Sequence, residues 1–177
     1  SQMEGLLNLN ICYNALFHDV DWLLDVKNKI IPIKKVYHVF RGSRRGWDAL
    51  FYPLNGEHNI EPKYLKRVLL NARNVTELVT VADRDAFCCN VSMEELKHRG
   101  DLGALRWIEK FADQRNGVGK PLPMVLKRKG MQWYELQDNE VAEVFTAMNP
   151  DQRLFFAKFE TPSFVNQRLI GLTHREA

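Results

Sequence analysis

The stretch KKVYHVFRGSRRGWDALFY, residues 34–52, decides how the rest of the chain is interpreted. Its first half is rich in β-branched and aromatic residues, so we expect a strand over residues 33–40. Gly42 and Gly46 then enclose a short basic turn, and glycine adopts positive φ at turns more readily than other residues. Apolar residues resume after the turn. The stretch therefore predicts an arginine loop, residues 41–46, held between two buried segments.

The chemistry of this loop points to a polyanion. Arg41, Arg44 and Arg45 each carry a guanidinium fork, which can bind a phosphate bidentately or read a guanine edge. Residues 27–73 hold 11 Lys and Arg against 3 Asp and Glu, whereas the rest of the chain holds 14 against 19. The alternative is that the arginines form an ordinary solvated surface. The concentration of positive charge favours a nucleic-acid interface.

Length and composition limit the classes that the chain can belong to. The 177 residues suffice for one domain with a core, and 45% hydrophobic with 27% charged residues is the composition of a globular protein. No apolar run approaches the roughly 20 residues of a membrane helix, so we expect a cytoplasmic protein without membrane contact. Three cysteines without a C-x-x-C spacing predict free thiols rather than a disulfide framework.

The order of elements predicts an α+β fold: a single mixed domain over residues 1–177 with a small, mostly antiparallel sheet, short helices and a C-terminal hairpin. Residues 1–20 fit either helix or extended chain. Expected helices cover residues 22–31, 62–69, 93–100, 102–114, 121–129 and 140–148. Expected strands cover residues 33–40, 76–81, 86–90, 131–136, 154–159 and 164–173, the last two joined by residues 160–163.

Two of these helices have clear sequence signals. Ser92 and Glu95 form a capping box, and Gly100 is placed to end the helix that they begin. Residues 102–114 carry apolar side chains at helical spacing on one face. These signals make residues 92–114 the part of the fold that sequence predicts most directly.

Signals of catalysis are missing from the sequence. The five histidines are scattered, and none has the spacing to a carboxylate or cysteine that a metal site needs. Neither a G-x-x-x-x-G-K nor a G-x-G-x-x-G motif occurs. We therefore expect no catalytic residue, no metal and no cofactor in this chain, and no enzymatic activity of the chain alone.

Five segments in order resemble the target-recognition region of N6-adenine DNA methyltransferases of restriction-modification systems, of the TaqI-like C-terminal specificity type. In that family a Gly-x-x-x-Gly turn follows a strand, and an aromatic residue and an apolar segment come next. The resemblance covers roughly residues 20–173. Its segments are RGSRRGWDALFYP (41–53), IEPKYLKRVL (60–69), WIEKF (107–111), WYEL (133–136) and FVNQRLIGL (164–172). The matching positions are Gly42, Gly46, Phe51, Ile60, Tyr64, Leu65 and Leu69.

The resemblance implies a division of labour. Such enzymes keep S-adenosylmethionine (SAM) and a catalytic (Asn/Asp/Ser)-Pro-Pro-aromatic motif in a separate domain, and this chain has neither that motif nor the F-x-G-x-G donor loop. We therefore expect a fragment of a larger methyltransferase. Its partners would be double-stranded DNA and the catalytic domain of the same polypeptide, into which the flipped adenine would enter.

The candidate DNA-binding residues lie in three clusters. The arginine loop and the 166–168 triplet, expected on a strand, would read bases, while the cations of residues 63–67 would contact phosphates. Two alternatives from other classes are a protein-interaction module that pairs through the C-terminal hairpin, and a structured-RNA binder. The candidate residues are Arg41, Ser43, Arg44, Arg45, Asp48, Lys63, Lys66, Arg67, Asn166, Gln167 and Arg168.

Overall fold

The structure, a computed structural model, describes residues 22–54, 56–136, 140–149 and 154–175. The chain divides into two compact units, residues 1–37 with residue 177 and residues 38–176. The sequence predictions for residues 1–20 and for Cys12 lie outside the described residues. The sheet and the core described below belong to the second unit.

In the first unit, the structure describes two short helices, α2 (Trp22–Val26) and α3 (Ile33–Val36). The helix predicted from residue 22 is present and ends before Pro32. The strand predicted from residue 33 begins later than expected, because the Tyr37 amide closes a helical turn on the Ile33 carbonyl. Strand β1 then covers Tyr37–Arg41.

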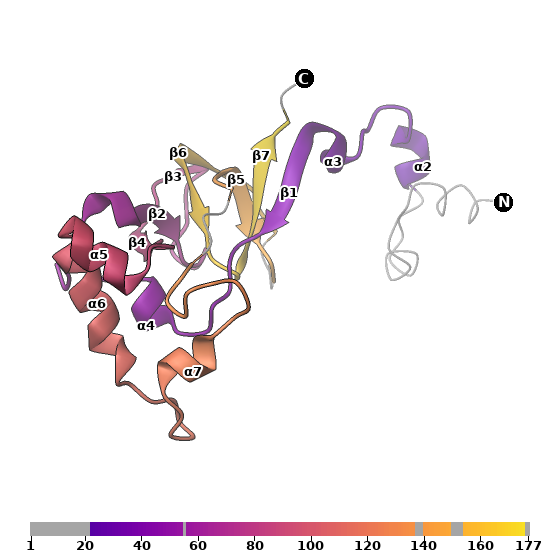
Figure 1. The fold of residues 1–177 in the computed structure, drawn as a ribbon. Helices are drawn as coiled ribbons and strands as arrows, with labels where there is room; N and C mark the ends of the chain where they lie inside the picture. The colour runs from indigo at the N-terminus through magenta and orange to yellow at the C-terminus, as the bar shows by residue number, and fades with distance from the viewer. Residues whose placement is uncertain (1–21, 55, 137–139, 150–153, 176–177) are drawn as a thin grey trace. The chain divides into compact units, whose positions relative to one another are not determined.

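A seven-stranded mixed sheet organises the second unit, so the predicted α+β class is confirmed. Its order is β1-β7-β5-β6-β2-β4, with β3 paired to β6 (Figure 1). The pairs β2–β4, β5–β6 and β5–β7 are antiparallel, and β2–β6 and β3–β6 are parallel. The strands are β2 (Leu65–Leu69), β3 (Val79–Thr80), β4 (Arg84–Phe87), β5 (Ala142–Ala147), β6 (Ala157–Val165) and β7 (Leu169–His174).

The two C-terminal strands do not form the predicted hairpin. Strand β5 lies between β6 and β7 and pairs with both. The predicted connection, residues 160–163, lies inside β6, and the real connection is the turn at residues 166–168. Thr161 and Pro162 are exposed positions of a long strand rather than a turn. The turn residues at 160–163 therefore did not interrupt β6, because the strand is held by its pairing with β5.

Three further element predictions are wrong. Residues 65–69 and 142–147 form strands instead of helices, and residues 131–136 form turns instead of a strand. Strand β5 is hydrogen-bonded on both edges and buried at positions that do not alternate, so its pattern imitates a helix. Only a 3₁₀ turn, η2 (Pro62–Tyr64), remains of the predicted helix at residue 62.

Four helices contribute residues to one hydrophobic cluster with β2 and β4. They are α4 (Asp48–Phe51), α5 (Met93–Arg99), α6 (Leu102–Ala112) and α7 (Leu122–Leu126). Helix α7 lies farther from these strands than α4, α5 and α6 (Figure 1). The Ser92 half of the predicted capping box is confirmed, because the Glu95 amide donates to the Ser92 hydroxyl at 3.2 Å, while the Glu95 carboxylate accepts from Arg99. Gly100 ends α5 with φ of 76°, as predicted. The buried face of α6 includes Ile108 and Phe111.

Two hydrophobic clusters hold the second unit together. The larger cluster joins the helices to β2 and β4, and the Trp107 Nε1 atom donates to the Leu50 carbonyl within it, at 3.0 Å. The smaller cluster lies on the sheet and contains Phe145 and Phe159, whose ring centroids are 4.6 Å apart. The arginine loop leaves β1 and enters α4, so it connects the sheet to the helices.

Candidate nucleic-acid interface

The two glycines of the arginine loop serve different purposes. Gly46 has φ of 91°, as predicted for a turn glycine. Gly42 does not have positive φ, contrary to the prediction. A Cβ atom at Gly42 would lie 2.0 Å from the Val165 carbonyl oxygen and 2.3 Å from that of Asn166. Glycine is therefore required at residue 42 because the loop backbone passes directly against the end of β6.

This close approach brings together two candidate stretches more than 120 residues apart. The Arg41 Nε atom donates to the Gln167 carbonyl at 3.0 Å, and the backbones of Ser43 and Asn166 form a parallel bridge. The Arg168 Nη1 atom lies 3.6 Å from an Asp48 carboxylate oxygen, with both side chains about half exposed. The arginine loop and the 166–168 turn therefore form one surface.

A groove of about 630 Å³ lies on this surface, and we call it the basic groove. Three arginines and three carboxamide side chains line it, and none of its described lining residues is acidic. Met148 and Phe155 contribute apolar surface. The charged and carboxamide residues are Arg41, Arg73, Arg168, Asn71, Asn149 and Gln167.

A second groove of about 510 Å³ adjoins the basic groove, and we call it the loop groove. The two grooves share Gln167 and Arg168 as lining residues. Arg44 lines the loop groove together with Gln114, which comes from the segment after α6. Positive side chains therefore continue from one groove into the other.

Arg45 does not lie on this surface, so its predicted position in a DNA groove is wrong. It is 8% exposed, and its Nη2 atom donates to the carbonyls of Leu126, Gln132 and Trp133 at 2.9–3.3 Å. The guanidinium also stacks over the Phe51 ring, 5.5 Å from its centroid. Burial lowers the pKa of Arg45. Arg45 therefore holds the loop in place from inside.

Asn166 is also buried, at 1% exposure, so the prediction that it reads a base edge is not supported. Its amide donates to the Leu69 carbonyl at 3.1 Å, and its side-chain oxygen accepts from the Arg168 amide at 3.2 Å. Burial raises the pKa of the neighbouring Tyr52 to about 12 despite a hydrogen bond with Asn166. Asn166 shapes the turn that presents Gln167 and Arg168.

The predicted phosphate contacts Lys66 and Arg67 lie on β2 and line a third, smaller pocket of about 310 Å³. This pocket shares no lining residue with the basic groove or the loop groove. The Arg67 Nη1 atom lies 2.8 Å from an Asp85 carboxylate oxygen, and Glu160 also lines the pocket. Lys66 is exposed and pairs with no carboxylate among the described residues.

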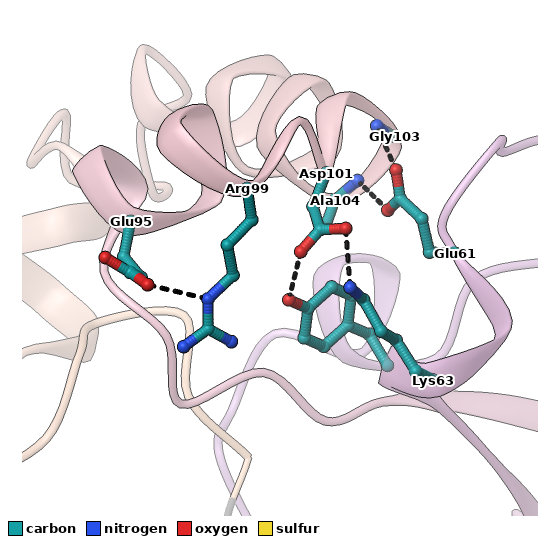
Figure 2. Close-up of polar contacts among 8 residues, drawn as sticks. Glu61, Lys63, Glu95, Arg99, Asp101, Gly103 and Ala104 are labelled. Carbon is teal, nitrogen blue, oxygen red and sulfur yellow. Dashed lines mark hydrogen bonds and ion pairs between the residues drawn. The ribbon is translucent and has the colours of Figure 1, made fainter.

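Lys63 is bound to an internal carboxylate (Figure 2). Its Nζ atom lies 2.6 Å from one Asp101 oxygen, and the Tyr64 hydroxyl donates to the other at 2.6 Å. These contacts with Lys63 and Tyr64 lower the pKa of Asp101. The Glu61 carboxylate accepts from the Gly103 and Ala104 amides at 2.8 Å each, which joins η2 to the start of α6. This cluster stabilises the fold.

Arg73 is the main groove residue that was not among the candidates. Arg73 is the last residue of the stretch 27–73 in which Lys and Arg are concentrated. Its side chain is exposed and makes no ion pair among the described residues. Asn71 accepts from the Arg73 amide at 3.0 Å and lines the same groove. The polar residues directly after β2 were the available signal, but no structure or role was predicted for residues 70–75.

The comparisons with known proteins identify no class of site for this chain. Among the described residues, no group of three or more His, Cys, Asp and Glu side chains is placed to hold a metal ion. No helix in the described part of the chain has the length and apolarity to cross a membrane. The chain matches no protein-family model and no curated protein.

Proposed function

We propose that this chain recognises double-stranded DNA as the specificity part of an N6-adenine DNA methyltransferase, and that the chain alone methylates nothing. The observation that supports this proposal best is the basic groove, where three arginines and three carboxamides converge without an acidic residue among the described lining residues. Arginine and carboxamide side chains are the groups that contact phosphates and base edges in DNA complexes. A DNA-binding role agrees with a cytoplasmic location.

Within this proposal the groove residues divide into two tasks. Arg41 and Arg73 are exposed lining residues of the basic groove and in this proposal supply positive charge toward the phosphate backbone. Gln167 and Arg168 line both grooves, and in this proposal their side chains read base edges. Glutamine suits adenine and arginine suits guanine. Arg44 and Asp48 extend the contact surface through the loop groove.

The catalytic partner supplies the remaining chemistry in this proposal. SAM and the residues that act on the flipped adenine would belong to the catalytic domain of the same polypeptide, because this chain lacks their motifs. Incubation of the chain with methyl-labelled SAM and duplex DNA should label no DNA. Methyl transfer by the chain alone would contradict this part of the proposal.

The decisive experiment measures binding of the full chain to fluorescein-labelled duplexes at 50 mM salt. Arg41→Ala/Arg168→Ala should weaken binding by about 1–3 kcal/mol for each arginine that contacts a base bidentately, or roughly 5- to 150-fold each. The control Arg106→Ala/Lys110→Ala removes two exposed cations from α6, outside all three grooves. Equal binding by Arg41→Ala/Arg168→Ala and the parent chain would contradict the assigned surface.

Sequence selectivity and nucleic-acid type need their own measurement. Selection from a random duplex library should enrich one short motif, and Gln167→Ala should relax the preference at one position of that motif. Single-stranded RNA and an acidic protein, titrated in parallel, test the RNA-binding and protein-binding alternatives. The protein-binding alternative proposed that a partner strand pairs with an exposed edge of the C-terminal hairpin. Strands β6 and β7 both lie inside the sheet, so neither offers that edge.

A further inference from the structure

Residues 115–130, which we call the second basic segment, carry five Lys and Arg and no Asp or Glu. All five cationic side chains are exposed. Lys120, Lys127 and Lys129 make no ion pair with any carboxylate among the described residues. A group of cations without internal counterions attracts polyanions, and the attraction is larger when the group is held in one geometry.

The first half of this segment is a tightly hydrogen-bonded turn. The Asn116 side-chain oxygen accepts from the amides of Val118 and Lys120 at 3.1 and 2.9 Å. The Asn116 amide donates to the Lys120 carbonyl at 2.9 Å, and the Arg115 Nη1 atom donates to the Gly119 carbonyl at 2.8 Å. Gly119 has φ of 77°, which the turn requires. The position of Lys120 relative to Arg115 is therefore fixed.

The second half is anchored in the core and against the arginine loop. Leu122 and Leu126 of α7 are buried in the larger hydrophobic cluster. The buried Arg45 donates to the Leu126 carbonyl at 3.1 Å, and the Arg128 Nη2 atom donates to the Arg44 carbonyl at 3.0 Å. An arginine from each segment thus binds the backbone of the other.

This double connection places the second basic segment beside the loop groove. Arg44 lines that groove, and Gln114, the residue directly before the segment, lines it as well. Residue 114, directly before the segment, and Arg128 within it therefore meet the loop groove and the arginine loop, while the three lysines line none of the three grooves. The segment is held to the arginine loop by the buried Arg45–Leu126 hydrogen bond and by the exposed Arg128–Arg44 hydrogen bond.

We infer that the second basic segment is a second phosphate-contacting element, in which Lys120, Lys127 and Lys129 bind the DNA backbone beside the site that reads bases. This inference rests on the proposed DNA-binding function. It adds phosphate contacts to those proposed for Arg41 and Arg73, and it replaces the predicted contacts of Lys63 and Arg67, which are paired with Asp101 and Asp85. A phosphate contact carries no sequence information, so its loss should affect all duplexes alike.

The test compares Lys127→Ala/Lys129→Ala with a matched control, Lys97→Ala/Lys158→Ala. Both variants of the full chain remove two exposed lysines, but Lys97 and Lys158 lie on α5 and β6 and line none of the three grooves. Affinity for two unrelated duplexes is measured between 50 and 300 mM KCl. The slope of log K against log salt should fall by about two units in the first variant and by less than one in the control.

The result separates this inference from the proposed function. An unchanged slope in the Lys127/Lys129 variant, with binding lost in Arg41→Ala/Arg168→Ala, would overturn the second basic segment and leave the proposed function standing. A loss confined to one of the two duplexes would also overturn the assignment to phosphates. A parent chain that binds neither duplex would overturn both. Thermal melting of each variant confirms that the substitutions at exposed lysines leave the fold intact.

Discussion

Two basic regions of this molecule look alike in sequence and differ in structure. In the arginine loop and the 166–168 turn, Arg41, Arg44 and Arg168 line grooves together with carboxamides. On η2 and β2, Lys63 and Arg67 each bind an aspartate, at 2.6 and 2.8 Å. Two of the three cations of the second region are thus paired at close range, whereas in the first region only Arg168 faces a carboxylate, that of Asp48, at 3.6 Å. Charge counted along a sequence is therefore not the charge that a partner meets.

The largest expected effect is a difference in unfolding free energy between alanine variants of two adjacent arginines, Arg44 and Arg45. Arg45→Ala should lower the free energy of unfolding by about 3 kcal/mol or more, because it leaves buried carbonyls without a donor and opens space beside Phe51. Arg44→Ala, at an exposed side chain, should change it by less than about 0.5 kcal/mol. Urea unfolding of both variants checks this. Equal stability losses would mean that Arg45 does not anchor the loop.

DNA binding should separate the two regions when equal charge is removed from each. Arg41→Ala/Arg73→Ala should weaken duplex binding by about 2 kcal/mol, roughly 30-fold, because both side chains face the basic groove. Lys63→Ala/Arg67→Ala should weaken it by less than about threefold, because those cations are already paired. Anisotropy titrations at one salt concentration make the measurement. A larger loss of duplex affinity in Lys63→Ala/Arg67→Ala than in Arg41→Ala/Arg73→Ala would contradict the proposed difference between the two regions.

Alanine substitutions at Gly42 and Gly46 should lower the stability of the first region for different physical reasons. Gly42→Ala should lower the free energy of unfolding by about 2 kcal/mol or more, since its Cβ would meet the backbone of residues 165 and 166. Gly46→Ala should cost about 1–2 kcal/mol, from positive φ alone, because the space around it is open. Thermal and urea unfolding would rank the pair, and a larger loss at Gly46 would contradict the close approach at Gly42.

The smallest expected effect is a pH dependence in the second region. The folded pKa of Asp101 lies below the value of about 3.9 expected in the unfolded chain, so Asp101 stabilises the fold above that value. This contribution should be lost as the pH falls through the lower, folded pKa. Unfolding free energies measured from pH 6 to pH 3 should decline more steeply in the parent chain than in Asp101→Asn. Parallel curves would show that Asp101 titrates normally.

Local signals with their own physical chemistry were readable from the sequence. The α+β class, the capped helix α5 and the amphipathic helix α6 follow from caps and periodicity within a few residues. The meeting of residues 41–48 with residues 166–168 did not follow from sequence, although both stretches were candidates. That contact depends on strand order, and β5 was predicted as a helix.

The sequence by itself determined that basic residues are concentrated in one part of the chain and that Gly42 and Gly46 enclose two of them, Arg44 and Arg45. Only the tertiary structure decided which cations remain available. It buried Arg45 against backbone carbonyls, paired Lys63 with Asp101, and left Arg73 exposed in a groove. The physical reason is that a guanidinium or ammonium binds whichever acceptor the fold brings within about 3 Å, and those acceptors come from distant segments.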